Sequence, residues 1–122
     1  MRARLKSLRS DDVPDLARYA PALPDEFAVP LILEVGPLGL RGREEFELLV
    51  VTPRWLLRRH GAGGVVSGRS KLIVFEWDFA RVKAFLTREV AACSGESWPE
   101  VARRVGRFAD WPGDAENVIG LR

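Results

Sequence analysis

The sequence has 122 residues, of which 47% are hydrophobic and 30% are charged. This composition is typical of a folded protein and argues against disorder, and the length predicts a single domain over residues 1–122. No apolar run approaches the roughly 18 residues of a membrane helix, and no apolar core follows the basic N-terminus, so we expect neither a membrane partner nor a signal peptide. Because the single cysteine, Cys93, excludes an internal disulfide, we expect a cytoplasmic protein.

The net charge of +2 conceals a segregation of charge along the chain. Residues 11–50 carry nine acidic side chains and three arginines, whereas residues 51–90 carry eight basic and three acidic side chains. The pattern favours a fold in which oppositely charged segments lie side by side and stabilise each other modestly. An alternative is that acidic and basic faces are separate and steer a charged partner.

The first half of the chain predicts three strands. Residues 3–8 alternate polar and apolar side chains, and a turn or short helix followed by a proline-containing loop occupies residues 11–25. A second strand is predicted over residues 27–35 and a third over 44–52, joined by a glycine-containing hairpin loop. Because Pro30 cannot donate a hydrogen bond to a neighbouring strand, it suggests an edge strand or a bulge.

The second half predicts helices around one further strand. Thr52 and Pro53 are typical of a helix start, and this helix should end before Gly61. A strand is predicted over residues 71–77, followed by a long helix over 79–93 that Asp78 caps. The sequence Ser-Trp-Pro-Glu at residues 97–100 is a capping box that begins a last helix.

This order predicts an α+β fold: a four-stranded, mainly antiparallel sheet with two C-terminal helices packed on one face and a short helix before the last strand. Apolar residues at strand or helix spacing should form its core. The ones we select are Phe27, Leu31, Phe46, Leu48, Leu72, Val74, Phe85, Leu86, Val101, Val105 and Phe108.

Residues 63–70, GGVVSGRS, resemble a phosphate-binding loop but lack its essential features. Arg69 stands where such a loop needs lysine, and helix signals precede the glycines while strand signals follow them. A phosphate-binding loop requires the opposite order, because the helix must begin at the phosphates. The glycines therefore indicate a flexible connection between a helix and a strand.

No arrangement of residues indicates an enzyme. Cys93 lies on the apolar stripe of a predicted helix, and His60 lies at the end of a short basic helix. These two residues are too few for a zinc site, and Glu44 and Glu45 point to opposite faces of their strand. We therefore expect no catalytic residues, no cofactor and no metal.

Nucleic-acid binding is the alternative function that the residues themselves suggest. Basic side chains are interleaved with Trp55, Phe75 and Trp77, a mixture used for phosphate contacts and base stacking. The basic residues concerned are Arg54, Arg58, Arg59, Arg69 and Lys71. Because the acidic segment offsets this charge, a small nucleic-acid-binding domain remains the second choice.

Four segments in the same order resemble a known family. They are RARLKSLRSDDV near the N-terminus, VVTPRWL, SGRSKLIV, and GESWPEVARRVGRF near the C-terminus. Together they resemble the Immunity protein 8 family of bacterial proteins, which are encoded beside polymorphic toxins. The resemblance implies a protein that binds and silences a cognate toxin domain, with no catalytic residue and no cofactor. The glycine-rich residues 60–66 and the tail after Trp111 depart from the family pattern.

An immunity protein of this kind should inhibit by docking, and acidic residues are favoured because many such toxins attack nucleic acids and carry basic clefts. Candidates for partner binding lie outside the predicted core stripes. They are Glu44, Glu45, Asp110, Trp111, Asp114 and Glu116. For Trp111 the competing interpretation is that its ring covers the end of the last helix.

Overall fold

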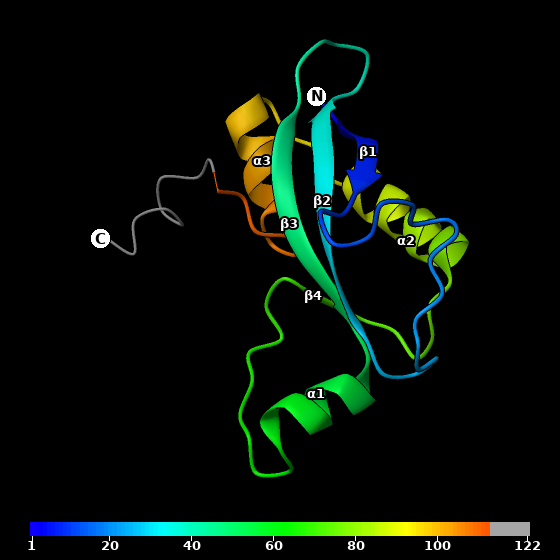
Figure 1. Cartoon of the computed structure of the whole chain (residues 1–122). Helices are drawn as coiled ribbons and strands as arrows, with labels where there is room; N and C mark the ends of the chain where they lie inside the picture. The colour runs from blue at the N-terminus through cyan, green and yellow to red at the C-terminus, as the bar shows by residue number, and fades with distance from the viewer. Residues whose placement is uncertain (113–122) are drawn as a thin grey trace.

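A four-stranded sheet in the order β1-β2-β3-β4 organises the protein, and the computed structural model describes residues 1–112 (Figure 1). The elements in chain order are β1 (Ala3–Arg9), β2 (Ala28–Pro37), β3 (Glu44–Val51), α1 (Pro53–His60), β4 (Lys71–Ile73), α2 (Phe79–Ala91) and α3 (Trp98–Val105). β1 and β3 pair with β2 in antiparallel orientation, and β4 pairs with β3 in parallel. The predicted α+β fold with a mainly antiparallel sheet is therefore confirmed.

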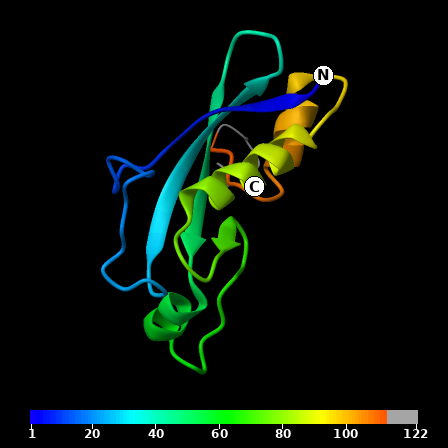
Figure 2. The same ribbon diagram turned by 90° about the vertical axis from the view of Figure 1, so that its right-hand side faces the viewer.

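Two helices cover one face of the sheet, and the core lies beneath them (Figure 2). Alternate residues of β2 and β3 point to this face, from Val29 to Val35 and from Phe46 to Val50, and all are buried. They pack against Val82, Leu86 and Val90 of α2 and against Val101 and Val105 of α3. No helix among residues 1–112 covers the opposite face of these strands, which we call the open face.

The helices begin where the sequence predicts. The side chains of Thr52, Asp78 and Ser97 accept hydrogen bonds from backbone N–H groups in the first turns of α1, α2 and α3. The capping box of α3 is modified, because the Glu100 carboxylate accepts from the backbone N–H of Glu96 rather than that of Ser97. Side-chain oxygens thus satisfy N–H groups that have no partner within the helix.

Several local predictions differ from the structure. Val82, Leu86 and Val90 form the buried stripe of α2. Phe85 lies to one side of this stripe and is therefore 39% exposed. Pro30 lies in an interior strand, but the pairing of β1 with β2 ends at Ile32, so no strand flanks Pro30 on that side. Leu72, Val74 and Phe108 are only partly buried, whereas the other selected core residues apart from Phe85 are buried.

Element lengths also differ from the predictions. β4 ends at Ile73 instead of residue 77, because β3 ends at Val51 and offers no further pairing. α2 ends at Ala91 instead of residue 93, and residues 11–19 form turns without a helix.

The N-terminus is fastened to the chain after α2. The Ala3 N–H donates to the carbonyl of Cys93 at 3.0 Å, and the Gly95 N–H donates to the carbonyl of Met1 at 2.9 Å. The Arg2 guanidinium donates to the carbonyl of Ala91, at the C-terminal end of α2, where a cation is also favoured by the helix dipole. We call this arrangement the terminal clasp.

Candidate functional site

A hollow of about 410 Å³ lies on the open face, where β1 has ended. Its floor is apolar. It is formed by Pro30 and Ile32 of β2 and Leu49 of β3, whose side chains point away from the helices. Acidic residues form much of its rim, together with Arg69 and Lys71. These acidic residues are Asp11, Asp12, Glu47 and Asp110. The hollow thus combines an apolar floor with a charged, mainly acidic rim.

Asp110 is fixed at this rim by backbone and side-chain contacts. Its N–H and carbonyl form two 2.8 Å hydrogen bonds with Glu47, so the segment after α3 adds to the outer side of β3. Its carboxylate accepts a hydrogen bond from the Ser70 hydroxyl at 2.7 Å and forms an ion pair with Arg69 at 3.6 Å. These contacts hold the carboxylate in place before any partner arrives.

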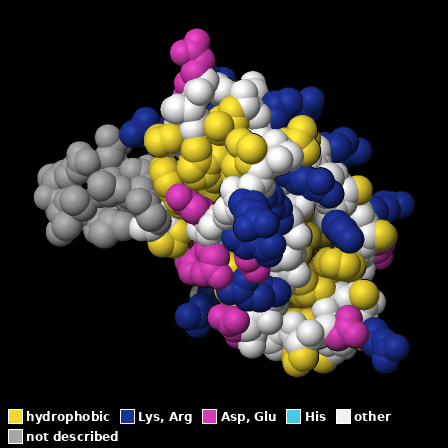
Figure 3. Space-filling model, turned by 90° about the horizontal axis from the view of Figure 1, so that it is seen from above, with side chains coloured by type: hydrophobic (Ala, Val, Ile, Leu, Met, Phe, Trp, Pro, Cys, Tyr) yellow, Lys and Arg dark blue, Asp and Glu magenta, His cyan; other side chains and the backbone are white. Residues whose placement is uncertain are grey.

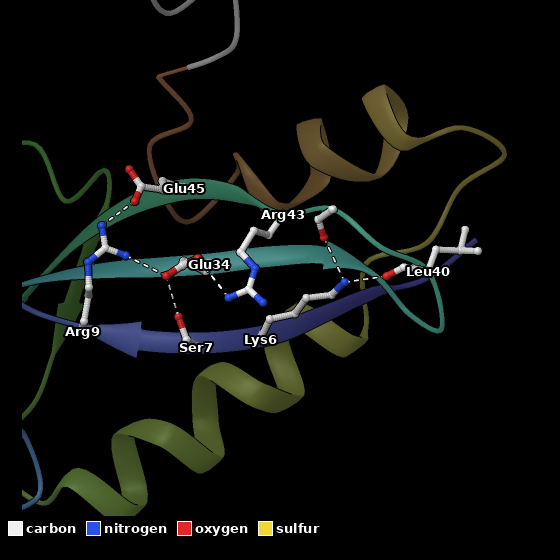
Figure 4. Close-up of polar contacts among 8 residues, drawn as sticks. Lys6, Ser7, Arg9, Glu34, Leu40, Arg43 and Glu45 are labelled. Atoms are coloured by element: carbon white, nitrogen blue, oxygen red, sulfur yellow. Dashed lines mark hydrogen bonds and ion pairs between the residues drawn. The ribbon is translucent and has the colours of Figure 1, made fainter.

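A cluster of polar residues extends the open face along β1, β2 and β3 (Figure 4). Glu34 accepts hydrogen bonds from the Ser7 hydroxyl at 2.9 Å, from Arg9 at 2.8 Å and from Arg43 at 3.1 Å. Arg9 also contacts Glu45, which places Glu45 on the same face. The hydrogen bonds from Ser7 and Arg43, reinforced by the charge of Arg9, hold the pKa of Glu34 below its usual value.

The hairpin loop between β2 and β3 is tied to β1. Lys6 Nζ donates to the carbonyls of Leu40 at 2.6 Å and Gly42 at 2.9 Å (Figure 4). The absence of a side chain at Gly36 lets the loop lie close to β2, because a Cβ atom there would lie 2.1 Å from the carbonyl oxygen of Gly42. The loop is therefore held close against the end of the open face.

The structure brings together only some of the partner-binding residues predicted from sequence. Glu45 and Asp110 share the open face, whereas Glu44 points to the helix face, with its Oε2 atom buried and without a hydrogen-bond partner in the described chain. Trp111 is 9% exposed and stacks on Phe46, which supports its interpretation as a cover for the core and leaves it little surface for a partner. Asp114 and Glu116 lie outside the described residues.

Three acidic residues of the hollow were not among the partner-binding candidates predicted from the sequence. Glu47 shares a face with Glu45 by simple alternation, and that signal was visible in the sequence. Asp11 and Asp12 join the rim because β1 ends at Arg9 beside β2. Their position depends on long-range pairing, so no local pattern pointed to them.

The described residues offer no catalytic or metal-binding cluster. Cys93 is buried, burial raises the pKa of its thiol, and its Sγ atom donates to the carbonyl of Glu89. His60 lies at the exposed end of α1, with its ring against Trp55. Within residues 1–112 no three His, Cys, Asp or Glu side chains lie close enough to hold a metal ion, and no helix is long and apolar enough to cross a membrane.

The basic residues that suggested nucleic-acid binding are largely paired with acids. Arg54 forms an ion pair with Asp25 at 3.1 Å, Arg58 pairs with Glu26, and Arg69 pairs with Asp110. The expectation that oppositely charged segments lie side by side is thus confirmed, and Figure 3 shows basic and acidic side chains intermixed on the face seen from above. Trp77 packs its ring against Tyr19 and Phe27, so it is not free to stack on bases.

Comparison with known families decides between the remaining functions. The model of the family described as Immunity protein 8 (Imm8) matches residues 3–115, nearly the whole chain. The chain belongs to the Immunity protein 8 family. Members are non-catalytic toxin inhibitors, so this immunity protein is not an enzyme, and its family implies a cognate toxin as partner. Neither the curated proteins nor the solved structures gave a match.

Proposed function

We propose that this immunity protein neutralises its cognate toxin by stoichiometric docking of the open face, without chemistry. The observation that carries the proposal is the hollow, whose apolar floor is surrounded by a charged rim. Binding energy in protein interfaces concentrates in a few well-packed contacts that polar neighbours shield from water. Pro30, Ile32 and Leu49 supply the apolar centre, and the rim supplies the shield.

The acidic rim selects the kind of toxin surface that fits. Asp11, Asp12, Glu47 and Asp110 favour a basic surface, such as the cleft of a toxin that acts on nucleic acid. Complementary charge mainly accelerates encounter and rejects wrong partners, whereas buried apolar contacts slow dissociation. Glu45 continues the acidic character along β3 next to the hollow.

Separate substitutions test these two roles. Replacing Asp11 and Asp12 with asparagine and Glu47 with glutamine keeps the shape of the rim and removes three charges. We expect the association rate to fall roughly tenfold at low salt and the difference to shrink as salt rises. Leu49→Ala should instead raise the dissociation rate. Both are measured by surface plasmon resonance against the toxin domain encoded beside this protein.

Controls away from the open face make the result specific. Glu89→Gln removes one exposed acid from α2, and Leu57→Ala removes an exposed apolar side chain from α1. Neither should change binding or the rescue of cells that express the toxin. The proposal is rejected if folded open-face variants bind and protect as the parent does.

A further inference from the structure

A second surface, between β4 and α2, is more apolar than the open face. It is a groove of about 660 Å³ in which Ile73, Phe75 and Phe85 are 50%, 76% and 39% exposed, and Ala84 of α2 also lines it. We call these four residues and the edge of β4 the β4 groove. Large apolar side chains exposed close together are characteristic of interaction surfaces in soluble proteins.

The β4 groove lies beside an unpaired strand edge. β4 is the last strand of the sheet, so its outer side has no neighbouring strand within the described chain (Figure 2). An exposed edge presents backbone N–H and carbonyl groups that another strand can satisfy. Apolar side chains and a free edge therefore occur at the same place.

The charges around the groove identify the occupant. The lining includes Arg81 and Arg88 of α2 and Glu76 and Asp78 of the preceding segment, so it carries equal numbers of each sign. Asp78 pairs with Arg81 at 3.4 Å, whereas neither Glu76 nor Arg88 forms an ion pair with any described residue. A surface with one sign of charge would repel its own copy, whereas this lining carries both signs.

We propose that the β4 groove binds a second copy of this chain about a two-fold axis. The two β4 edges run antiparallel, Phe75 and Phe85 of each copy are buried against the other copy, and Glu76 of one copy meets Arg88 of the other. A two-fold interface requires such self-complementarity, because both copies contribute the same patch. A separate protein would need to match both signs of charge in the same narrow groove.

This association leaves the toxin-docking surface accessible. Lys71 at the start of β4 lines the hollow, but no described residue lines both the hollow and the groove. Each copy in the dimer thus retains an open face. The inference does not depend on the proposed function, since it concerns the protein without its toxin.

Sedimentation equilibrium of the purified chain across the micromolar range tests the proposal. We expect a monomer–dimer equilibrium, and we expect Phe75→Glu to weaken it by at least about 100-fold, since the carboxylate would be buried in the interface. Val65→Glu is the matched control, because Val65 is 99% exposed and lies outside the groove. Circular dichroism of both variants verifies that they are folded.

A charge exchange provides an independent readout of the same interface. Glu76→Arg alone should weaken the dimer, and the double variant with Arg88→Glu should restore it, because each opposed pair is re-formed with its signs exchanged. A parent protein that is monomeric throughout, or a dimer that persists in Phe75→Glu, would overturn the proposal. So would a monomeric parent whose toxin affinity falls in Phe75→Glu, because the toxin would then be the occupant.

Discussion

Glu34 shows how single residues organise the open face. Its carboxylate accepts from Ser7 of β1, from Arg9 of β1 and from Arg43 in the loop before β3. One side chain on the central strand β2 therefore connects both neighbouring segments. The interaction depends on the charged carboxylate, because hydrogen bonds from Ser7 and Arg43 lower the pKa of Glu34.

The lowered pKa of Glu34 gives a defined dependence of stability on pH. A carboxyl group whose pKa is lower in the folded state contributes stability above its unfolded pKa of about 4.3, and this contribution is lost as pH falls through the folded value. Glu34→Gln should lower the free energy of unfolding at neutral pH and should flatten its decrease below about pH 4.3. Urea unfolding at a series of pH values measures this, with Glu89→Gln as the control. Parallel profiles for Glu34→Gln and the parent would contradict the assignment.

Adjacent residues of α2 differ sharply in burial. Leu86 is fully buried against the sheet, whereas Phe85 lines the β4 groove and is partly exposed. Leu86→Ala should reduce the free energy of unfolding by about 2–5 kcal/mol, because it leaves a cavity in the core. Phe85→Ala in dilute protein should reduce it by only about 1 kcal/mol. Chemical denaturation of the two variants measures the difference, and equal losses would contradict the observed orientation of α2.

At the scale of elements, Thr52 joins α1 to the sheet. It is completely buried, and its hydroxyl oxygen accepts from the N–H of Trp55 at 3.2 Å and from the N–H of Phe27 at 3.3 Å. The same atom therefore caps α1 and satisfies the backbone just before β2. A substitution at this position affects a helix and a strand together.

Thr52→Ala should reduce the free energy of unfolding by about 1–3 kcal/mol, because it leaves two N–H groups without their acceptor. Thr52→Ser keeps the hydroxyl and should retain most of the stability. Thermal and urea unfolding of the two variants measure the comparison. A loss in Thr52→Ser as large as that in Thr52→Ala would assign the effect to the missing methyl group instead.

Elements whose patterns are local were predictable from the sequence, and their ends were less so. The alternation Phe46, Leu48, Val50 identifies the buried face of β3 because side chains alternate along any strand. The length of β4 could not be predicted from a local pattern, because a strand at the edge of a sheet continues only as far as its neighbour. β3 ends at Val51 and α1 begins after its N-cap Thr52. The sequence alone does not decide whether Phe85 belongs to the buried stripe of α2. Packing against the sheet determines which apolar side chains of the helix are covered.

At the scale of the whole molecule, the sequence predicted the acidic candidates only in part. Glu45 and Asp110 come to one face, but Asp11 and Asp12 join them through pairing between distant segments. The ion pairs of Arg54 and Arg58 with Asp25 and Glu26 likewise unite the acidic and basic halves of the chain. Local sequence patterns do not show which distant segments become neighbours, which is why Asp11 and Asp12 could not be predicted as part of the hollow.

The terminal clasp has a consequence for the order of events during synthesis. Met1 and Ala3 find their hydrogen-bond partners at Cys93 and Gly95, about ninety residues later in the chain. At translation rates of roughly 5–20 residues per second, the start of β1 leaves the ribosome many seconds before those partners do. Closing so long a segment is also entropically slow compared with forming a local turn. The native pairing at the start of β1 is therefore completed only after the chain has been made through Gly95.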